Sequence, residues 1–371
     1  MKLAKIIKHY EKAFLEANPN ALPSQLKALS AIKNCRTAAC GEVVVKCTDC
    51  NLIHTFFRSC GHRNCPRCQN DTTTRWLTRQ KEKLLPVTYF LVTFTLPAQL
   101  RSLAYHHQRK VFSSMFQTAV NSLKTLASKQ KFLHGEIGMT GVLHTHSRRL
   151  DYHPHIHFIV PGGGFNPKKK QWKKSTKKFL IKVQSLSKLF RGKFLSEMQR
   201  QKLTYPHVLH KMDWVVHCKP VGSGEKALEY LSRYLYRGVI REKNILSDEN
   251  GKVTFSYVDS ETNETKKRTL PGVKFLEHLL KHVLPRGFRK SRDYGLLHSS
   301  RKKLLRRMQL ILRVKLKTED PPKEKWICKT CCNPMKVIAM IIHGRFIPIR
   351  GSPNKKQKPT HLSNRNPLGG A

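Results

Sequence analysis

Acidic residues are scarce in this chain. Its 371 residues include 23 Asp and Glu against 71 Lys and Arg, which gives a net charge of +48. The basic excess runs from Lys2 to Arg365 and is not confined to a tail. Self-repulsion of this size is typical of a protein that meets a polyanion. We therefore expect a nucleic acid as the partner, with an anionic membrane surface as the competing interpretation.

Long hydrophobic runs are also missing. No apolar run reaches the roughly 18 residues of a membrane span, and no signal peptide opens the chain. We therefore expect a soluble, cytoplasmic protein with no membrane partner. Because cytoplasmic thiols are kept reduced, the 11 cysteines are expected to bind metal and not to form disulfides.

Seven of the cysteines are clustered between Cys35 and Cys68. The cluster contains two CxxC pairs, Cys47–Cys50 and Cys65–Cys68. A CxxC turn places two thiolates on one edge of a tetrahedron, so two turns predict one structural zinc site with no position open to water. The other candidate ligands, for a second zinc site or for substitution in the first, are Cys35, Cys40, Cys60, His54 and His62.

A third CxxC pair, Cys328–Cys331, lies near the C-terminus. One such pair is half of a zinc site. Its candidate partners are Cys332, His343 or another chain, and a turn without metal is the alternative.

The segment YHPHIHFIVPGGG at 152–164 alternates as a strand does. His155 and His157 point to one side of such a strand, and Ile156 points to the other. The preceding strand candidate ends near His144 and His146. A hairpin brings the two segments together, and imidazoles on one face have ligand geometry for a divalent metal with open positions. Histidines that merely pack in a core or line a wet face are the alternative.

Residues 224–241 read GEKALEYLSRYLYRGVIR and predict a helix. At about 100° per residue, Tyr230 and Tyr234 lie about 40° apart on a basic stripe. The core stripe is formed by Leu228, Leu231, Leu235 and Val239, and the cations beside the tyrosines are Lys226, Arg233, Arg237 and Arg241. Cations that bind phosphate also favour a phenolate nucleophile. Tyrosines that only cover aliphatic neighbours are the alternative.

Together these motifs resemble the HUH superfamily of single-strand DNA endonucleases. In particular they are similar to the two-tyrosine rolling-circle transposases of bacterial insertion sequences, which have an N-terminal zinc-binding module. The resemblance extends from about residue 30 to about residue 340, and it is carried by SCGHRNCPRCQ, HPHIHFIVPGGG, LFRGKF, EYLSRYLYRGVI and LPRGFRKSRDYGLL.

The resemblance implies an α+β fold, with an antiparallel ferredoxin-like nuclease core preceded by a small zinc-binding domain. The corresponding division is a helical and zinc-binding module at 1–85, a core at 86–300, and a basic region with a disordered tail at 301–371. Patterning predicts helices at 1–34, 74–85, 99–128, 179–198 and 224–241, and strands at 89–96, 138–145, 155–160 and 213–218.

The resemblance also implies the chemistry. His155 and His157 hold Mg²⁺ or Mn²⁺, with His144 as the third ligand and His146 as its rival. Tyr230 and Tyr234 are then the nucleophiles that nick and rejoin single-stranded or hairpin element ends through a 5′-phosphotyrosine. The implied DNA contacts are Lys226, Arg233, Arg237 and Arg241, and the implied place of action is the bacterial nucleoid.

Two other functions fit the same residues. One is a zinc-containing nucleic-acid-binding protein without catalysis, in which the histidines and tyrosines pack or stack. The other is a plasmid replication initiator or relaxase with the same chemistry.

Overall fold

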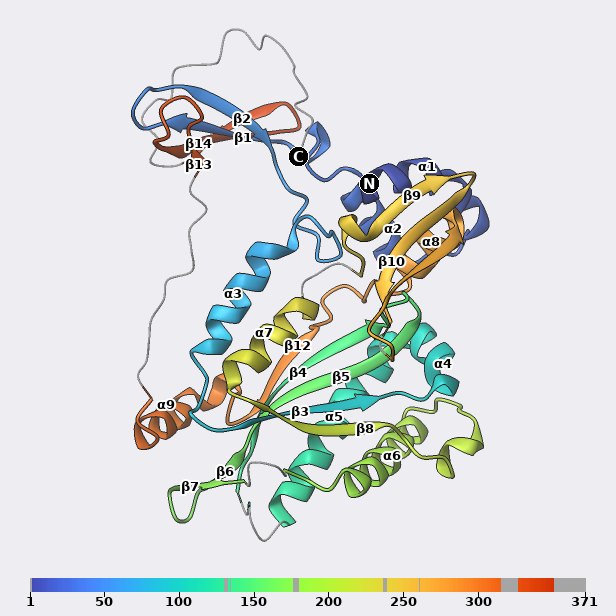
Figure 1. Cartoon of the computed structure of the whole chain (residues 1–371), viewed down its shortest axis with the longest axis vertical. Coiled ribbons are helices and arrows are strands. Elements are labelled where there is room, and N and C mark those ends of the chain that lie inside the picture. The colour runs from blue at the N-terminus through green and yellow to red at the C-terminus, as the bar shows by residue number, and fades with distance from the viewer. Residues whose placement is uncertain are drawn as a thin grey trace. The chain divides into compact units, whose positions relative to one another are not determined.

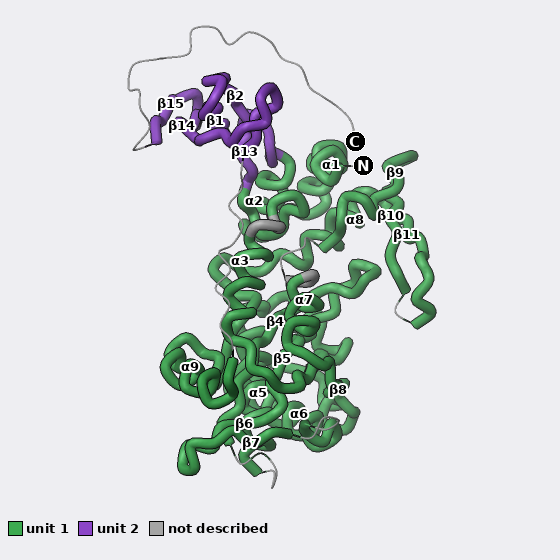
Figure 2. Tube along the Cα trace, turned by 60° about the vertical axis from the view of Figure 1, so that its left-hand side comes forward, with its two compact units in different colours: residues 1–33, 61–321 green, residues 34–60, 322–371 purple. Residues whose placement is uncertain are grey.

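The computed structural model describes residues 2–129, 133, 135–175, 180–235, 239–259, 261–314 and 326–349, with the backbone alone for 69–71 and 233–235. The chain forms two compact units. Unit 1 contains 1–33 and 61–321, and unit 2 contains 34–60 and 322–371 (Figure 2). In the part of the chain that is described, no helix is long and apolar enough to cross a bilayer.

Unit 1 is built on a five-stranded antiparallel sheet in the order β12-β4-β5-β3-β8. Its strands are β3 (Tyr89–Thr95), β4 (Gly138–His146), β5 (Tyr152–Pro161), β8 (Val216–Gly222) and β12 (Ser291–Gly295). The central strands are rich in β-branched and aromatic residues, which fit a pleated, buried surface. The predicted α+β class with an antiparallel core sheet is confirmed.

Helices cover both faces of this sheet (Figure 1). On one face Phe94, Ile156 and Phe158 pack into a core with α5 (Gln108–Lys129) and α6 (Val183–Arg200). On the other face Leu91, Val142 and Ile159 pack against α3 (Gln69–Lys81) and α7 (Gly224–Leu235). Because successive strand residues alternate between faces, the odd-numbered residues of β5 face α7.

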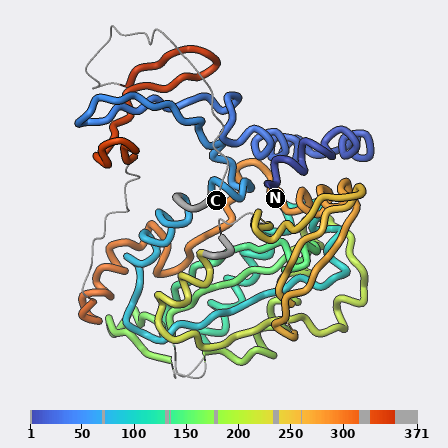
Figure 3. The backbone as a smooth tube through the Cα atoms, turned by 45° about the horizontal axis from the view of Figure 1, so that its top comes forward, coloured from blue at the N-terminus to red at the C-terminus, as the bar shows by residue number. Residues whose placement is uncertain are grey.

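A second group of elements lies beside the turn between β4 and β5. It contains the three-stranded sheet β11-β10-β9 and the helices α1 and α8, which pack on each other. The hydroxyl of Tyr10 on α1 donates to Asp248 Oδ1 on β9 at 2.6 Å. The β10–β11 hairpin, orange in the backbone trace of Figure 3, belongs to this group. It reaches the β4–β5 turn, where Arg148 donates to the carbonyl of Val258. The β11-β10-β9 sheet, with α1 and α8, therefore packs beside the central strands β4 and β5 and contacts the turn between them.

The remaining elements of unit 1 have the following bounds. They are α1 (Leu3–Ala17), α2 (Pro23–Lys33), α4 (Arg101–His106), α8 (Gly272–Leu280), α9 (Lys302–Ile311), β6 (Gly163–Asn166), β7 (Gln171–Lys174), β9 (Ile245–Glu249), β10 (Lys252–Val258), β11 (Thr265–Pro271), and the 3₁₀ turns η2 (Ala98–Leu100), η3 (His207–His210), η4 (Glu242–Asn244) and η5 (Ser299–Arg301).

Unit 2 is made from two distant parts of the sequence. Its elements are η1 (Ala38–Cys40), β1 (Glu42–Cys47), β2 (Ile53–Phe57), β13 (Trp326–Ile327), β14 (Pro334–Ile342) and β15 (Arg345–Pro348). Strand β1 pairs with β2 on one side and with β14 on the other, and both pairings are antiparallel. The sheet therefore joins residues near the N-terminus to residues near the C-terminus.

The division into units differs from the predicted 1–85, 86–300 and 301–371. Residues 1–33 belong to unit 1 with the five-stranded sheet, whereas 34–60 form a unit with 322–371. The physical reason is the β1–β14 ladder, which a local reading of the sequence does not reveal. The cysteine-rich unit therefore includes residues that follow unit 1 in sequence as well as residues near the N-terminus. The predicted disordered tail lies outside the described residues.

Candidate active site and metal centres

Three histidines meet on the face of the sheet that α7 covers. His144 on β4 is directly opposite His155 on β5, and His157 follows two residues later on the same face. One ring nitrogen from each of His144, His155 and His157 lies within 4.8 Å of the others. Ile156 lies between the two β5 histidines in sequence and is buried in the core of the opposite face. The alternation of side chains along β5 thus places the histidines on one face of the sheet and the apolar core on the other.

Hydrogen bonds orient two of these rings. His155 Nδ1 donates to the carbonyl of His153 at 2.7 Å, so the neutral ring keeps its Nε2 lone pair for a metal. His157 Nδ1 lies 2.7 Å from the hydroxyl of Thr93 on β3. A partner on the second nitrogen fixes the ring plane and the tautomer of a metal-binding histidine.

Burial keeps the three imidazoles neutral. It lowers the pKa of His157 to about 3, and the neighbouring His155 adds to this effect. It lowers the pKa of His155 to about 4 and holds the pKa of His144 well below its ordinary value. A neutral imidazole is the form that binds a metal. The donor set, three nitrogens on one side, fits a divalent cation with open positions for substrate.

His146, the rival third ligand, is outside this group. The register shifts after His144, so His146 pairs with Tyr152. Its ring lies 5.5 Å from the ring of His282, between centroids. Of the two candidates, the structure brings His144 to the pair on β5.

Tyr230 lies on α7 above the histidine cluster. Leu228 and Leu231 of this helix are buried against the sheet, as the predicted leucine stripe requires. The ring of Tyr230 is 6.3 Å from that of His157, and its residue is 40% exposed. At the start of the helix, a Cβ on Gly224 would lie 2.8 Å from Cε2 of Tyr89 on β3. The absence of a side chain there lets the helix begin close to the sheet.

The other residues expected on this helix are placed as follows. Lys226 is on α7 and exposed. Tyr234 and Arg233 are on α7 by their backbone, and their side chains are not described. Arg237 lies outside the described residues.

The predicted helix 224–241 is too long at its C-terminal end. The described helix ends at Leu235, and Arg241 has an extended backbone with φ −89° and ψ 139°. Arg241 is therefore not part of a helical basic stripe with Tyr230. The sequence has a glycine at position 238, and glycine costs about 1 kcal/mol relative to alanine in a helix.

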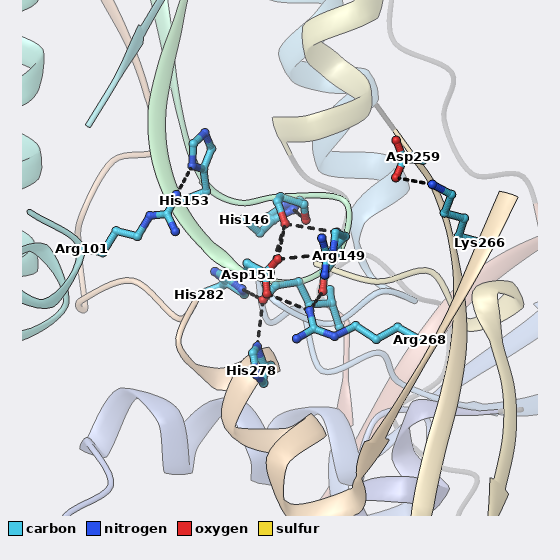
Figure 4. A network of polar contacts seen from close by, with 12 residues as sticks. Arg101, His146, Arg149, Asp151, His153, Asp259, Lys266, Arg268, His278 and His282 are labelled. Carbon is cyan, nitrogen blue, oxygen red and sulfur yellow. Dashed lines mark hydrogen bonds and ion pairs between the residues drawn. The ribbon is translucent and has the colours of Figure 1, made fainter. Parts of the chain in front are cut away.

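A polar network that the sequence did not reveal supports the β4–β5 turn (Figure 4). Arg268 Nη1 on β11 contacts Asp151 Oδ1 at 2.8 Å. Burial acts to raise the pKa of the Asp151 carboxyl, but the hydrogen bond and charge of Arg268 outweigh it, so this pKa is lowered. His278 and His282 each place a ring nitrogen 3.2 Å from the carbonyl of Leu150. The only sequence signal for this network was the abundance of histidine.

Four cysteines of unit 2 form a second candidate metal centre. Their Sγ atoms lie within 4.8 Å of one another, and the four are Cys47, Cys50, Cys328 and Cys331. The N–H of Asp49 is the main group that lowers the pKa of Cys47, and the N–H groups of residues 331 and 330 lower that of Cys328 to about 6. Four thiolates at this spacing fit a structural zinc ion.

This grouping corrects the predicted pairing of the two N-terminal CxxC turns. Cys47 and Cys50 are completed by the third CxxC pair, not by Cys65 and Cys68, because β14 pairs with β1 and carries that pair beside it. Neither Cys332 nor His343 is a member of the group. A zinc-binding role for Cys65, Cys68 and Cys60 stays a prediction.

Comparison with known proteins adds two family matches. The family described as "Putative transposase" matches residues 138–304, which include the histidine strands and α7. The family described as "Transposase zinc-binding domain" matches residues 6–96. The third CxxC pair lies outside both matches.

Two similar proteins cover most of the chain. "Putative transposase y4qJ" of Sinorhizobium fredii is 35% identical over 318 residues, which are 80% of this chain and 80% of that protein. The transposase for insertion sequence element IS801 of Pseudomonas savastanoi pv. phaseolicola is 28% identical over 294 residues, 74% of this chain and 70% of that protein.

Among solved structures, the conjugative relaxase TrwC in complex with mutant oriT DNA is similar over 61% of this chain and 74% of its own. The identity is 12% and the TM-score is 0.25.

Proposed function

Because the chain belongs to the transposase family that includes the transposase of insertion sequence IS801, we propose that it nicks and rejoins single-stranded DNA at the ends of its element. The reaction passes through a 5′-phosphotyrosine intermediate in rolling-circle transposition. The observation that carries this proposal is the neutral cluster of His144, His155 and His157 beneath Tyr230.

Each part of the site has a role in this reaction. His144, His155 and His157 would hold a divalent cation, which would supply positive charge to stabilise the scissile phosphate. Thr93 and the carbonyl of His153 hold two of the rings in a fixed orientation. Tyr230 lies on the rim of the cluster, exposed to an incoming strand.

Tyr230 Oη attacks phosphorus, and the bond from phosphorus to the 3′-oxygen breaks. The proton lost by the phenol balances the proton gained by the leaving 3′-hydroxyl. A new 3′-hydroxyl later attacks the phosphotyrosine and releases the phenol, so the covalent bond conserves the energy for rejoining. Tyr234, one turn later on α7, supplies the second nucleophile for a second strand.

DNA is the proposed partner, because a protein with a net charge of +48 binds polyanions favourably. Lys226, Arg233, Arg237 and Arg241 are the proposed contacts to its phosphates.

The test is a covalent adduct. Full-length protein is incubated with Mn²⁺ and single-stranded oligonucleotides that carry candidate element ends, and adducts are detected on denaturing gels. We expect an adduct that maps to Tyr230 or Tyr234, and none for the Tyr230→Phe/Tyr234→Phe double variant. A protein that binds every oligonucleotide without forming an adduct is a binding module only. An adduct that survives in the double variant refutes the assignment of the nucleophiles.

A replication initiator or relaxase would also form the adduct. The same oligonucleotides, placed at both ends of a marked DNA segment, separate these functions. A transposase moves the segment to a second plasmid, whereas an initiator or a relaxase leaves it in place.

A further inference from the structure

The two CxxC turns of unit 2 share a backbone hydrogen bond and a residue with a left-handed backbone at the same positions. In the first, the N–H of Cys47 donates to the carbonyl of Leu52 at 2.8 Å, and Asn51 has a φ of 56°. In the second, the N–H of Cys328 donates to the carbonyl of Asn333 at 2.9 Å, and Cys332 has a φ of 57°. In each turn the residue directly after the second cysteine has the left-handed backbone. The hydrogen bond that closes the turn joins the first cysteine to the residue five positions later. Each turn supplies one pair of thiols, and the four Sγ atoms lie within 4.8 Å of one another.

The spacing of the thiols matches a metal and not a disulfide. Sγ–Sγ distances are 3.4 Å for Cys47–Cys331, 3.5 Å for Cys50–Cys331 and 3.7 Å for Cys50–Cys328. Zinc–sulfur bonds of about 2.3 Å at tetrahedral angles put sulfur atoms about 3.8 Å apart. A disulfide requires about 2.05 Å.

We propose that Cys47, Cys50, Cys328 and Cys331 bind one zinc ion that joins the two separate chain segments of unit 2. The family match for zinc binding ends at residue 96, so half of this site comes from a part of the chain outside it. The proposal concerns the fold of unit 2 and does not depend on the tyrosine chemistry.

Unit 2 is small, so a zinc ion would stabilise its fold. Its core is small, with Val45, Cys47, Cys328 and Met335 as the buried members. A core of this size supplies only a few kcal/mol, and small domains usually add a metal or a disulfide. Two of the four core members are also ligands, so the metal and the core are formed together.

The first experiment compares cysteine variants of the full-length protein. Zinc per chain is measured for the wild type, for Cys328→Ser/Cys331→Ser and for Cys332→Ser. Cys332 is the matched control, because it adjoins Cys331 and is not in the group. We expect the double variant to carry one zinc fewer per chain than the wild type, and the control to carry the same number. Equal zinc in the wild type and the double variant would overturn the proposal.

A second measurement uses the wild type alone, in case the double variant is insoluble. Alkylated cysteines are mapped by mass spectrometry before and after a chelator is added. We expect Cys47, Cys50, Cys328 and Cys331 to be protected together and released together, with Cys332 labelled throughout. Protection of Cys47 and Cys50 while Cys328 and Cys331 are labelled shows that the C-terminal pair is not a ligand.

A separate cavity in unit 1 carries a second inference. Its volume is about 610 Å³, and it adjoins Thr145 and His146, which directly follow His144 on β4. Six of its lining residues are cationic and two are acidic. The cations are Arg63, Arg79, Lys83, Arg289, Lys290 and Lys302, and the acids are Glu82 and Asp293.

Two of these cations shape the cavity. Lys83 contacts Asp293 at 2.5 Å. Arg63 donates to the carbonyls of Leu284, Pro285 and Phe288 at 2.7 to 2.8 Å.

Three other cations, Arg79, Arg289 and Lys302, are exposed. Burial, together with the charge of Arg63, lowers the pKa of Lys290 to about 8. The cavity therefore carries an excess of positive charge that an anion would relieve.

We propose that this cavity holds phosphates of the DNA strand next to the scissile phosphate. The inference rests on the proposed function, because Lys290, which lines the cavity, acts by its charge on His144 and His155 of the proposed active site. The cationic lining favours a polyanion as the ligand. Because the cavity lies near the histidines, we expect this polyanion to be the DNA strand that is cut.

The test removes charge from the cavity. Binding of a single-stranded oligonucleotide of about 20 nucleotides is measured without divalent metal at several salt concentrations. The variant is Arg79→Ala/Arg289→Ala/Lys302→Ala, and the control is Lys12→Ala/Lys27→Ala/Lys188→Ala, three exposed lysines that do not line the cavity. Each lost phosphate contact lowers the salt slope by about 0.7. We expect the affinity to fall at least about tenfold and the slope by about 2, with less than about a twofold loss in the control.

Equal losses in the variant and the control would overturn the cavity assignment. This failure is distinguishable from failure of the proposed function. A wild type that binds through the cavity but forms no adduct refutes the tyrosine chemistry alone. Adduct formation with unchanged binding by the cavity variant refutes the cavity alone.

Discussion

The ring of Tyr230 on α7 and the imidazole of His157 on β5 lie 6.3 Å apart between centroids, with their planes at 77°. The two residues are 73 positions apart in sequence, and the packing of α7 on the sheet brings them together. In the proposed reaction, a phosphate at the histidines would therefore lie next to Tyr230.

Single substitutions of the tyrosines should have partial effects. Tyr230→Phe and Tyr234→Phe should each still form adducts on a simple oligonucleotide, in unequal amounts, and should fail in complete transposition. The reason is that tyrosines one turn and about 40° apart can serve the same phosphate site in sequence. Gel-based adduct assays and a plasmid transposition assay check this. If one single variant is inactive and the other is normal in both assays, one tyrosine performs every step.

Loss of two histidines should separate cutting from binding. His155→Ala/His157→Ala should abolish adduct formation and leave the affinity for single-stranded DNA within about threefold, because phosphate contacts dominate affinity. The exposed His207 provides a control variant, His207→Ala, which should behave as the wild type. Cleavage by the double variant at the wild-type rate with Mg²⁺ or Mn²⁺ shows that the metal assignment is wrong.

The hydroxyl of Thr93 should matter through His157. Thr93→Val removes the group that lies 2.7 Å from His157 Nδ1, and loss of such a partner typically weakens metal affinity about 10- to 100-fold. Mn²⁺ titration of the folded protein measures this. Thr93→Ser keeps the hydroxyl and should bind Mn²⁺ nearly as well as the wild type. Equal Mn²⁺ affinity of the valine and serine variants would remove Thr93 from the site.

Stability should fall in mild acid because of His282. This ring is buried, and burial lowers its pKa to about 3 in the folded chain. In the unfolded chain its pKa is about 6.5, so between these values the unfolded state binds a proton that the folded state excludes. The free energy of unfolding is therefore full above about pH 6.5 and falls as the pH drops toward 3, by up to about 1.4 kcal/mol per pH unit.

Urea unfolding at about pH 5 and about pH 7 measures this slope. His282→Gln should show a smaller difference between the two conditions than the wild type does. An unchanged slope means that other groups govern the acid sensitivity.

Local patterns explain which parts of the site were predictable. The faces of β5 follow from the two-residue period of a strand, so His155 and His157 could be separated from Ile156 in sequence alone. The buried stripe of α7 follows in the same way from the helical period, as Leu228 and Leu231 show. These are properties of a few neighbouring residues.

Relationships across long distances in sequence were not predictable. The partners of Cys47 and Cys50 depend on the pairing of β1 with β14, and no local pattern encodes that pairing. The contact of Arg268 with Asp151 likewise depends on how the β9–β11 sheet docks, and that sheet was not predicted. The predicted helix at 1–34 is two helices, because α1 ends at Ala17 and α2 begins at Pro23, a residue suited to a first helical position.

The pairing of β1 with β14 sets an order of events during synthesis. Strand β1 ends at Cys47, but its partner strand is complete only at Ile342. At about 5–20 residues per second, the edge of β1 waits on the order of 15–60 s on the ribosome for its partner. Unit 2 is therefore finished last. A copy of the gene that is interrupted after the nuclease core should yield a chain whose β1 edge stays open to other strands, which favours its aggregation.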